Sequence, residues 1–179
     1  MAMDVLTYAT GMSIASPVYL DANFLIACRI RNHLKYNVAR GLLLELFAQD
    51  IDIFISTLTI DEVWWGLLGE WYHADTGQVL SARKVKAQPQ ILSQYARRLS
   101  AVTNQYLAWE NTTILPSSEI NAVDTVKSAL SYMTRHRVSP RDAFHLSLAK
   151  QSQAKGFITS DADFDALRIR GLHLTIYKY

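Results

Sequence analysis

Short, wholly apolar runs recur along the chain, separated by longer segments in which apolar residues return every three to four positions. An uninterrupted short apolar run is typical of a strand buried on both faces, as in a parallel sheet. Residues 1–15 show neither pattern and predict only a leader without committed structure. The apolar runs predict strands over residues 17–20, 51–55, 112–115, 157–159 and 172–177.

The longer segments predict amphipathic helices. Val38, Leu42 and Leu46 recur every four residues, which places them on one helical face. Residues 73–90 are polar, contain Gly and Pro, and are interpreted as a loop. Strands alternating with helices predict an α/β sandwich around a mainly parallel sheet. The helices are expected over residues 24–30, from residue 38 through 47, from Thr59 through Trp71, and over 91–109, 120–133 and 139–150.

Composition adds limits to this picture. The chain has 179 residues, the length of one ordinary domain, and half of them are hydrophobic, which excludes a disordered chain. The single cysteine, Cys28, excludes an intramolecular disulfide and a cysteine-built zinc site. No basic residue precedes Arg29, and no early apolar run has the length of a membrane span. We therefore expect a soluble, cytoplasmic protein with no membrane partner.

Acidic residues gather where ligands bind a parallel sheet, beyond the carboxyl ends of its strands. Asp21 follows the first strand, Glu62 lies about a helical turn beyond the second, and Asp161 follows the strand at 157–159, with Asp163 close behind. Asp142 lies in the first turn of the preceding helix. Because clustered carboxylates raise one another's pKa unless a cation neutralises them, they predict a site for Mg²⁺ or Mn²⁺.

Each acid also has a purely structural interpretation. Thr59 and Glu62 fit a capping box, and Ser139 with Asp142 fits a similar helix start. Asp21 fits a turn residue, and Asp161 fits a helix N-cap. Taken together, however, these caps would all have to fall on the same sheet edge by coincidence.

Two other side chains call for interpretation. His145 lies three residues after Asp142 among apolar neighbours, and we interpret it as a packed side chain rather than a metal ligand. Trp65 lies off the apolar stripe of its helix, where it is free to face a partner. Most of the stripe is assigned to the core; it comprises Trp64, Leu67, Leu68 and Trp71.

Four segments carry a family resemblance: residues 18–23 (VYLDAN), Ser56 with Glu62, residues 141–143 (RDA) and residues 158–164 (ITSDADF). In this order they resemble the PIN domain, in particular VapC-type ribonuclease toxins of bacterial toxin–antitoxin pairs. The resemblance runs from residue 17 to residue 177. It implies a three-layer α/β/α sandwich and a metal-dependent endoribonuclease that uses Mg²⁺ or Mn²⁺.

The resemblance also implies a role for each site residue. Asp21, Asp142 and Asp161 would hold the cation, which activates water and stabilises the phosphate and the leaving oxygen. Glu62 would orient or deprotonate the attacking water, or complete the metal shell. The supporting polar positions, which would hydrogen-bond the carboxylates or add an acid beside the metal, fall on Asn23, Thr159 and Asp163.

The chain departs from the family pattern in two places. Ala22 stands where a hydroxyl residue is common. Glu62 and Asp142 are 80 positions apart, more than a compact toxin of this type needs. The surplus predicts a helical insertion around residues 73–110 within a single domain of residues 1–179.

The net charge of +2 hides an uneven distribution. Residues 1–80 carry a net charge of −5 and residues 81–155 a net charge of +7, while the remainder balances. A basic region flanking acidic metal ligands suits an approaching RNA backbone, although a solvated helix face is the alternative for any one run. The candidate RNA-binding residues are Arg83, Lys84, Lys86, Arg97, Arg98, Arg135, Arg137 and Arg141.

Three functions follow from these residues, with the nuclease first. A catalytically silent PIN-like RNA-binding or scaffold module is the second, and the presence of all four acids disfavours it. A small-molecule phosphohydrolase with Asp21 as nucleophile is the third, and it would require a second Asp where Asn23 stands. The resemblance further implies an antitoxin that inserts into the active-site groove, and a homodimer.

Overall fold

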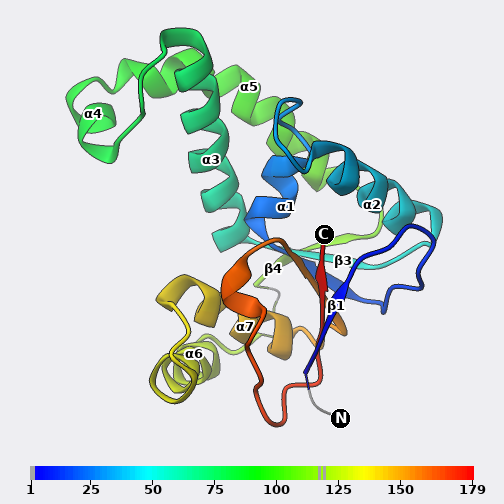
Figure 1. Ribbon diagram of the computed structural model, residues 1–179. Coiled ribbons are helices and arrows are strands. Elements are labelled where there is room, and N and C mark those ends of the chain that lie inside the picture. Colours follow the sequence, from blue (N-terminus) through cyan, green and yellow to red (C-terminus); the bar gives the residue numbers. More distant parts are fainter. Residues whose placement is uncertain (1–2, 117, 119) are drawn as a thin grey trace.

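The computed structural model describes residues 3–116, 118 and 120–179. Six strands form one sheet in the order β1-β6-β5-β2-β3-β4, and all five neighbouring pairs are parallel (Figure 1). The strands are β1 Asp4–Thr7, β2 Val18–Leu20, β3 Ile53–Ser56, β4 Thr112–Leu115, β5 Gly156–Thr159 and β6 Thr175–Lys178.

Helices cover both faces of this sheet, which confirms the α/β/α sandwich (Figure 1). Side chains of β2 alternate between the two cores, because Val18 and Leu20 pack on one face and Tyr19 on the other. One core is covered by α1 Ala22–Ala27, α2 Tyr36–Ala48, α3 Thr57–Thr76 and α5 Gln90–Leu107. The other is covered by α6 Ala122–His136 and α7 Pro140–Gln151.

The expectation of an unstructured leader over residues 1–15 is wrong for residues 4–7, while residues 8–15 form no helix or strand and residues 1–2 lie outside the described residues. Asp4–Thr7 form β1, which pairs with β6 at the edge of the sheet. Most of its residues are exposed, and Leu6 keeps 43% of its surface. Backbone pairing rather than burial therefore holds this strand, which explains why no hydrophobic pattern marks it.

The start of α3 also differs from the prediction. The helix begins at Thr57, and Ser56 Oγ caps it by accepting a 2.9 Å hydrogen bond from the Thr59 backbone N–H. The predicted capping box of Thr59 and Glu62 is therefore not the helix start. Because Ser56 performs the capping, the Glu62 side chain is available for other contacts.

A helical arm, here residues 68–99, stands away from the sheet (Figure 1). The predicted loop at 73–90 is partly wrong, because α3 continues to Thr76 and α4 forms at Ala82–Ala87. The arm has a small core of its own, formed by Leu68, Tyr72, Ile91 and Tyr95. The boundaries of an insertion at 73–110 stay a prediction. In the described ranges, no helix combines the length and apolar character needed to cross a bilayer.

The tryptophans of α3 are more exposed than their stripe predicts. Leu67 and Leu68 are buried, but Trp64 keeps 40% of its surface, and its indole N–H donates a 2.9 Å bond to Thr103 Oγ1 of α5. Trp65 is exposed as expected. Trp64 is therefore a member of the stripe that lies outside the core, and its indole links two helices at the surface.

Candidate active site

The predicted acids meet at the carboxyl edge of the sheet. Asp21 follows β2 and caps α1, and Asp161 follows the neighbouring β5 and caps the 3₁₀ turn η1, Ala162–Phe164. Glu62 projects from the second turn of α3, and Asp142 from the first turn of α7. They line an open cleft of about 360 Å³ with Ala22, Asn23, Ile26, Ser139, Arg141 and Asp163.

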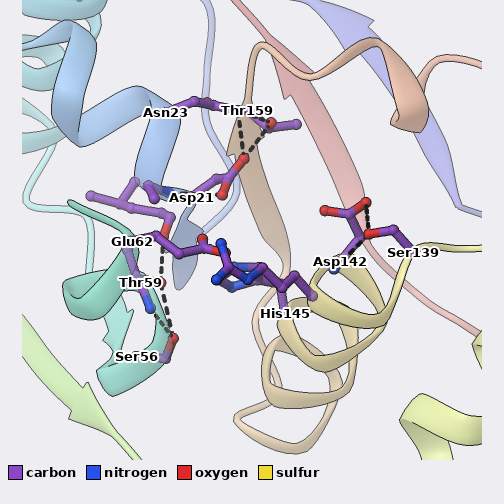
Figure 2. Close-up of polar contacts among 12 residues, drawn as sticks. Asp21, Asn23, Ser56, Thr59, Glu62, Ser139, Asp142, His145 and Thr159 are labelled. Carbon is purple, nitrogen blue, oxygen red and sulfur yellow. Dashed lines mark hydrogen bonds and ion pairs between the residues drawn. The ribbon is translucent and has the colours of Figure 1, made fainter. Parts of the chain in front are cut away.

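Asp21 lies deepest in the cleft, with 8% of its surface exposed. Its Oδ1 accepts a 2.7 Å bond from the Ala22 N–H, and its Oδ2 accepts bonds from Asn23 Nδ2 at 2.7 Å and Thr159 Oγ1 at 2.6 Å (Figure 2). Burial raises the pKa of Asp21, while the neighbouring His145 imidazole and the hydrogen bond from Thr159 oppose that rise. A bound cation would relieve the cost of keeping this carboxylate charged.

Asn23 and Thr159 link the two strand ends. Thr159 Oγ1 also accepts a 3.0 Å bond from the Asp161 N–H. Asn23 Oδ1 accepts bonds from the Ser160 N–H and from the Tyr179 hydroxyl, both at 3.2 Å. The structure therefore places both side chains where the sequence predicted them, in contact with Asp21.

Glu62 is held from two sides by groups of α7. His145 Nε2 lies 2.9 Å from Glu62 Oε2, and an Arg141 guanidinium nitrogen lies 3.4 Å from Glu62 Oε1. His145 is 2% exposed, and its Nδ1 is hydrogen-bonded to the Tyr19 hydroxyl at 2.8 Å. Figure 2 shows the ring pointing from α7 toward Glu62.

The interpretation of His145 as a packed side chain is thus incomplete. The ring is buried, but both of its nitrogens make polar contacts, and one contact is to a predicted catalytic acid. Its spacing of three residues from Asp142, which makes the two side chains neighbours on the helix surface, was the available signal.

Asp142, Asp161 and Asp163 gather on the other side of the cleft. Ser139 Oγ donates a 2.6 Å bond to Asp142 Oδ2, and the Asp163 N–H donates a 2.9 Å bond to Asp161 Oδ1. Burial, together with the charges of Asp161 and Asp163, raises the pKa of Asp142. In the described ranges, none of these three carboxylates forms an ion pair with a basic side chain.

The site thus contains two clusters of possible metal ligands, each with ligand atoms within 4.8 Å of one another. We call Asp21, Glu62 and His145 the inner cluster, and Asp142, Asp161 and Asp163 the outer cluster. The outer cluster offers only carboxylate oxygens, which suit Mg²⁺ or Mn²⁺. The inner cluster adds one imidazole to two carboxylates.

Lys178 is a contact of the site that the sequence did not predict. Its ammonium pairs with Asp165 Oδ1 at 2.8 Å and also donates to the backbone carbonyl of Asp161. The side chain is 14% exposed and extends from the end of β6. It therefore fixes the loop that carries Asp161 to the neighbouring strand.

Of the eight predicted RNA-binding residues, only Arg141 lines the acid cleft. Arg137, which caps α6 in the left-handed conformation at φ 57°, lines an adjoining cavity of about 210 Å³ that shares Asp142 and Asp163 with the cleft. Arg135 lies in the last turn of α6.

The other five belong to the helical arm. Arg98 lies 4.8 Å from the centre of the Trp71 ring and pairs with Asp75 at 3.7 Å. Lys84 stacks on Tyr72, with its nitrogen 4.9 Å from the ring centre. These two cations thus also stabilise the arm. Arg83 and Lys86 lie on α4, and Arg97 lies on α5.

Comparison with known proteins agrees with this geometry. The family model described as the PIN domain matches residues 18–169. The crystal structure of VapC20 from Mycobacterium tuberculosis, a toxin that cleaves the sarcin–ricin loop, is similar in fold, with a TM-score of 0.52 and 16% sequence identity. The similarity covers 83% of this chain and 93% of VapC20.

FitAcB from Neisseria gonorrhoeae also shows 16% identity, with a TM-score of 0.46 over 90% of this chain and 96% of that one. No curated protein sequence matches the chain.

Proposed function

The chain belongs to the PIN domain family, and from that premise we propose that it is a metal-dependent endoribonuclease, the toxin of a type II toxin–antitoxin pair. One observation carries the proposal: Asp21, Glu62, Asp142 and Asp161, from separate parts of the chain, line a single cleft. A scaffold that no longer cleaved RNA would have no need to keep four carboxylates together against their mutual repulsion.

The donor set fits a divalent cation. Burial raises the pKa of both Asp21 and Asp142, and the outer cluster adds repulsion among three carboxylates. A cation that accepts oxygen ligands would remove both penalties. We assign Mg²⁺ or Mn²⁺ on this chemistry, with Asp21, Asp142 and Asp161 as its ligands and Asp163 beside them.

The cation, when bound, supplies Lewis-acid stabilisation of the phosphate and lowers the pKa of a water. The side chains of this chain would do the rest. Glu62 orients or deprotonates the attacking water, or completes the metal shell. Asn23 and Thr159 hold Asp21 with both of its oxygens in fixed directions.

Asp21 is poorly suited to act as a nucleophile in a small-molecule phosphohydrolase. Both of its oxygens already accept hydrogen bonds, from Ala22, Asn23 and Thr159, and the side chain is buried. Such an enzyme would also need a second Asp where Asn23 stands, and the Asn23 amide donates to Asp21 instead. The geometry favours a ligand role for Asp21.

We assign the RNA backbone to the basic residues beside the cleft, with Arg137 and Arg141 nearest to the acids. The arm residues Arg83, Lys84 and Lys86 would guide RNA from farther away. A triple change of these three residues to Ala should weaken RNA binding at low salt and make the salt dependence shallower. Unchanged RNA affinity would show that these arm residues do not guide the RNA.

The toxin role includes an antitoxin that blocks the cleft, a homodimer and a cytoplasmic location. These parts rest on the family alone. A small neighbouring reading frame with a DNA-binding pattern would support the antitoxin, and its co-expressed product should abolish RNA cleavage. If no such gene exists, a solitary nuclease is the better reading.

The decisive experiment measures cleavage of RNA by Asp21→Asn and Asp142→Asn, with Mg²⁺ or Mn²⁺ and with a chelator. Both variants should lose cleavage, while Asp124→Asn, an acid on α6 outside the cleft, should keep it. Cleavage by both site variants at the wild-type rate would refute the site. Cation-dependent thermal stabilisation without cleavage by the wild type would instead indicate the silent RNA-binding module.

A further inference from the structure

We propose that Tyr19 and His145 form a buried hydrogen-bond chain that positions Glu62, so that its carboxylate faces the cation site in one orientation. The inference rests on the proposed nuclease function, because it concerns an acid of that site. It assigns His145 as a positioning residue that acts through Glu62.

The chain of contacts begins in the interior and ends at the cleft. Tyr19 donates a 2.6 Å bond to Ser56 Oγ, and its oxygen lies 2.8 Å from His145 Nδ1. His145 Nε2 then lies 2.9 Å from Glu62 Oε2. Tyr19 and Ser56 are fully buried and His145 nearly so. Each step is of normal hydrogen-bond length; the two inner steps are buried, and the step to Glu62 is partly buried at the cleft.

The inner end of the chain is anchored to the helix that carries Glu62. Ser56 Oγ, which receives the Tyr19 bond, also caps α3 by accepting from the Thr59 N–H. One residue cluster therefore sets both the start of the helix and the direction of a side chain in its second turn. The four groups come from β2, the end of β3, α3 and α7, so no single element can shift alone.

Without this support Glu62 would be loosely placed. A glutamate has three rotatable side-chain bonds, and ordering them costs conformational entropy. Its other contact, at 3.4 Å, comes from Arg141, whose side chain is 65% exposed. An exposed ion pair restrains geometry weakly. The buried imidazole of His145 is thus the rigid contact of Glu62. A histidine that only packs in the core could bond to any acceptor, but this one bonds to an acid of the cleft.

Stacking interactions hold the chain in place as well. The Tyr19 ring stacks on Phe157 with centroids 5.3 Å apart, and it meets the His145 ring edge-on at 5.7 Å. A stability control must therefore lie away from this stack. Leu46 of α2, which is fully buried in the core on the other face of the sheet, is suitable.

The test compares His145→Ala, His145→Gln and Tyr19→Phe, using RNA cleavage and Mn²⁺ binding followed by electron paramagnetic resonance. His145→Ala should lower kcat about 10- to 100-fold with little change in KM, and weaken Mn²⁺ binding by a similar factor. His145→Gln keeps an amide donor within reach of Glu62 and should recover part of both losses. Tyr19→Phe should show a smaller loss of the same kind.

Two controls separate positioning from stability. Tyr132 carries a buried hydroxyl for which the described residues provide no hydrogen-bond partner, so Tyr132→Phe should leave kcat and Mn²⁺ affinity unchanged. Leu46→Ala should lower the melting temperature without changing Mn²⁺ affinity. If Leu46→Ala weakens Mn²⁺ binding as much as His145→Ala does, the effect is one of stability and the proposal fails.

Other outcomes would also overturn the proposal. Wild-type kcat and Mn²⁺ affinity in His145→Ala would show that Glu62 needs no such support. A nitrogen coupling in the spectrum of bound Mn²⁺ that disappears in His145→Gln would make His145 a ligand instead. If the wild-type protein binds Mn²⁺ but cleaves no RNA, the proposed function fails, while the binding comparison still tests the positioning of Glu62.

Discussion

The two clusters of possible metal ligands in the cleft are built in different ways. In the inner cluster, Asp21 accepts three hydrogen bonds, and Glu62 is hydrogen-bonded to the buried imidazole of His145. In the outer cluster, Asp142 and Asp161 are half-buried and Asp163 is exposed. Neighbouring residues supply one short bond to the Asp142 carboxylate and one to that of Asp161.

The difference indicates a division of labour. The inner cluster is preorganised, because its oxygens already point in directions set by the sheet and by α7. In the outer cluster, burial is the larger cause of the raised pKa of Asp142, and repulsion from the Asp161 and Asp163 carboxylates raises this pKa further. We infer that the inner side sets the geometry of the site, while the outer side gains most from a bound cation.

The largest expected effect is on the inner side. In Asp21→Asn, one carboxylate oxygen becomes an amide nitrogen, which cannot accept a hydrogen bond. At least one of the three groups that donate to Asp21 therefore loses its partner, at a cost of about 1–3 kcal/mol. Loss of the charge should lower kcat about 10³-fold. Thermal unfolding and cleavage assays measure both effects. Asp163→Asn, on the outer side, should lose about tenfold in activity and no stability. Equal losses in the two variants would contradict the proposed difference between the inner and the outer cluster.

Thr159→Val tests the bridge between the clusters. The change keeps the shape of the side chain but removes the donor to Asp21 and the acceptor for the Asp161 N–H. Cation affinity should fall about 10- to 100-fold, as measured by Mn²⁺ titration. The control is Thr125→Val, another buried threonine whose hydroxyl is hydrogen-bonded away from the cleft. Comparable weakening in the control would mean that general destabilisation is responsible.

Lys178→Met tests how firmly the outer side is attached. The variant keeps an apolar stem but releases the Asp161 carbonyl and Asp165. We expect Mn²⁺ affinity to fall about tenfold, less than in Thr159→Val, because Asp161 keeps its bond to Thr159. Lys155→Met, at an exposed position, serves as the matched control. A larger loss in Lys178→Met than in Thr159→Val would reverse the proposed order.

The smallest effect concerns stability without divalent cations. Because the pKa of Asp142 is raised above its usual 3.8, the folded protein binds this proton more tightly than the unfolded chain does. Protonated Asp142 therefore contributes stability that is present at low pH and is lost as the pH rises from the usual carboxyl pKa through the raised pKa of the folded state. Asp142→Asn should melt about 2 °C above wild type at neutral pH, and the gap should close on acidification. A gap independent of pH would contradict repulsion as its source.

Much of this site was predictable from the sequence. Asp21 and Asp161 follow short apolar runs, and parallel strands bring such positions to one edge by their geometry. The pairing of β2 with β5 then brings Asn23 and Thr159 together, and both side chains donate a hydrogen bond to Asp21. Local patterns also predicted the cap of α7 at Ser139, which its hydrogen bond to the Asp142 N–H confirms.

Other features had no local signal. The edge strand β1 is held by backbone pairing with β6, at the opposite end of the sequence. Lys178 and Tyr179 reach the site from that same distant segment. The N-cap of α3 is Ser56 rather than the predicted Thr59, because Ser56 lies where the buried strand β3 ends.

By itself, therefore, the sequence determined the layered architecture and the family, and it predicted that four acids meet at one sheet edge, because apolar periodicity and short motifs are local properties. Only the tertiary structure divided the site into two clusters and turned His145 from a packed side chain into a contact of Glu62. Those facts depend on which helix faces meet across the sheet. Glu62 and His145 are 83 residues apart in the chain, and their 2.9 Å contact exists only once α3 and α7 pack beside the same strand.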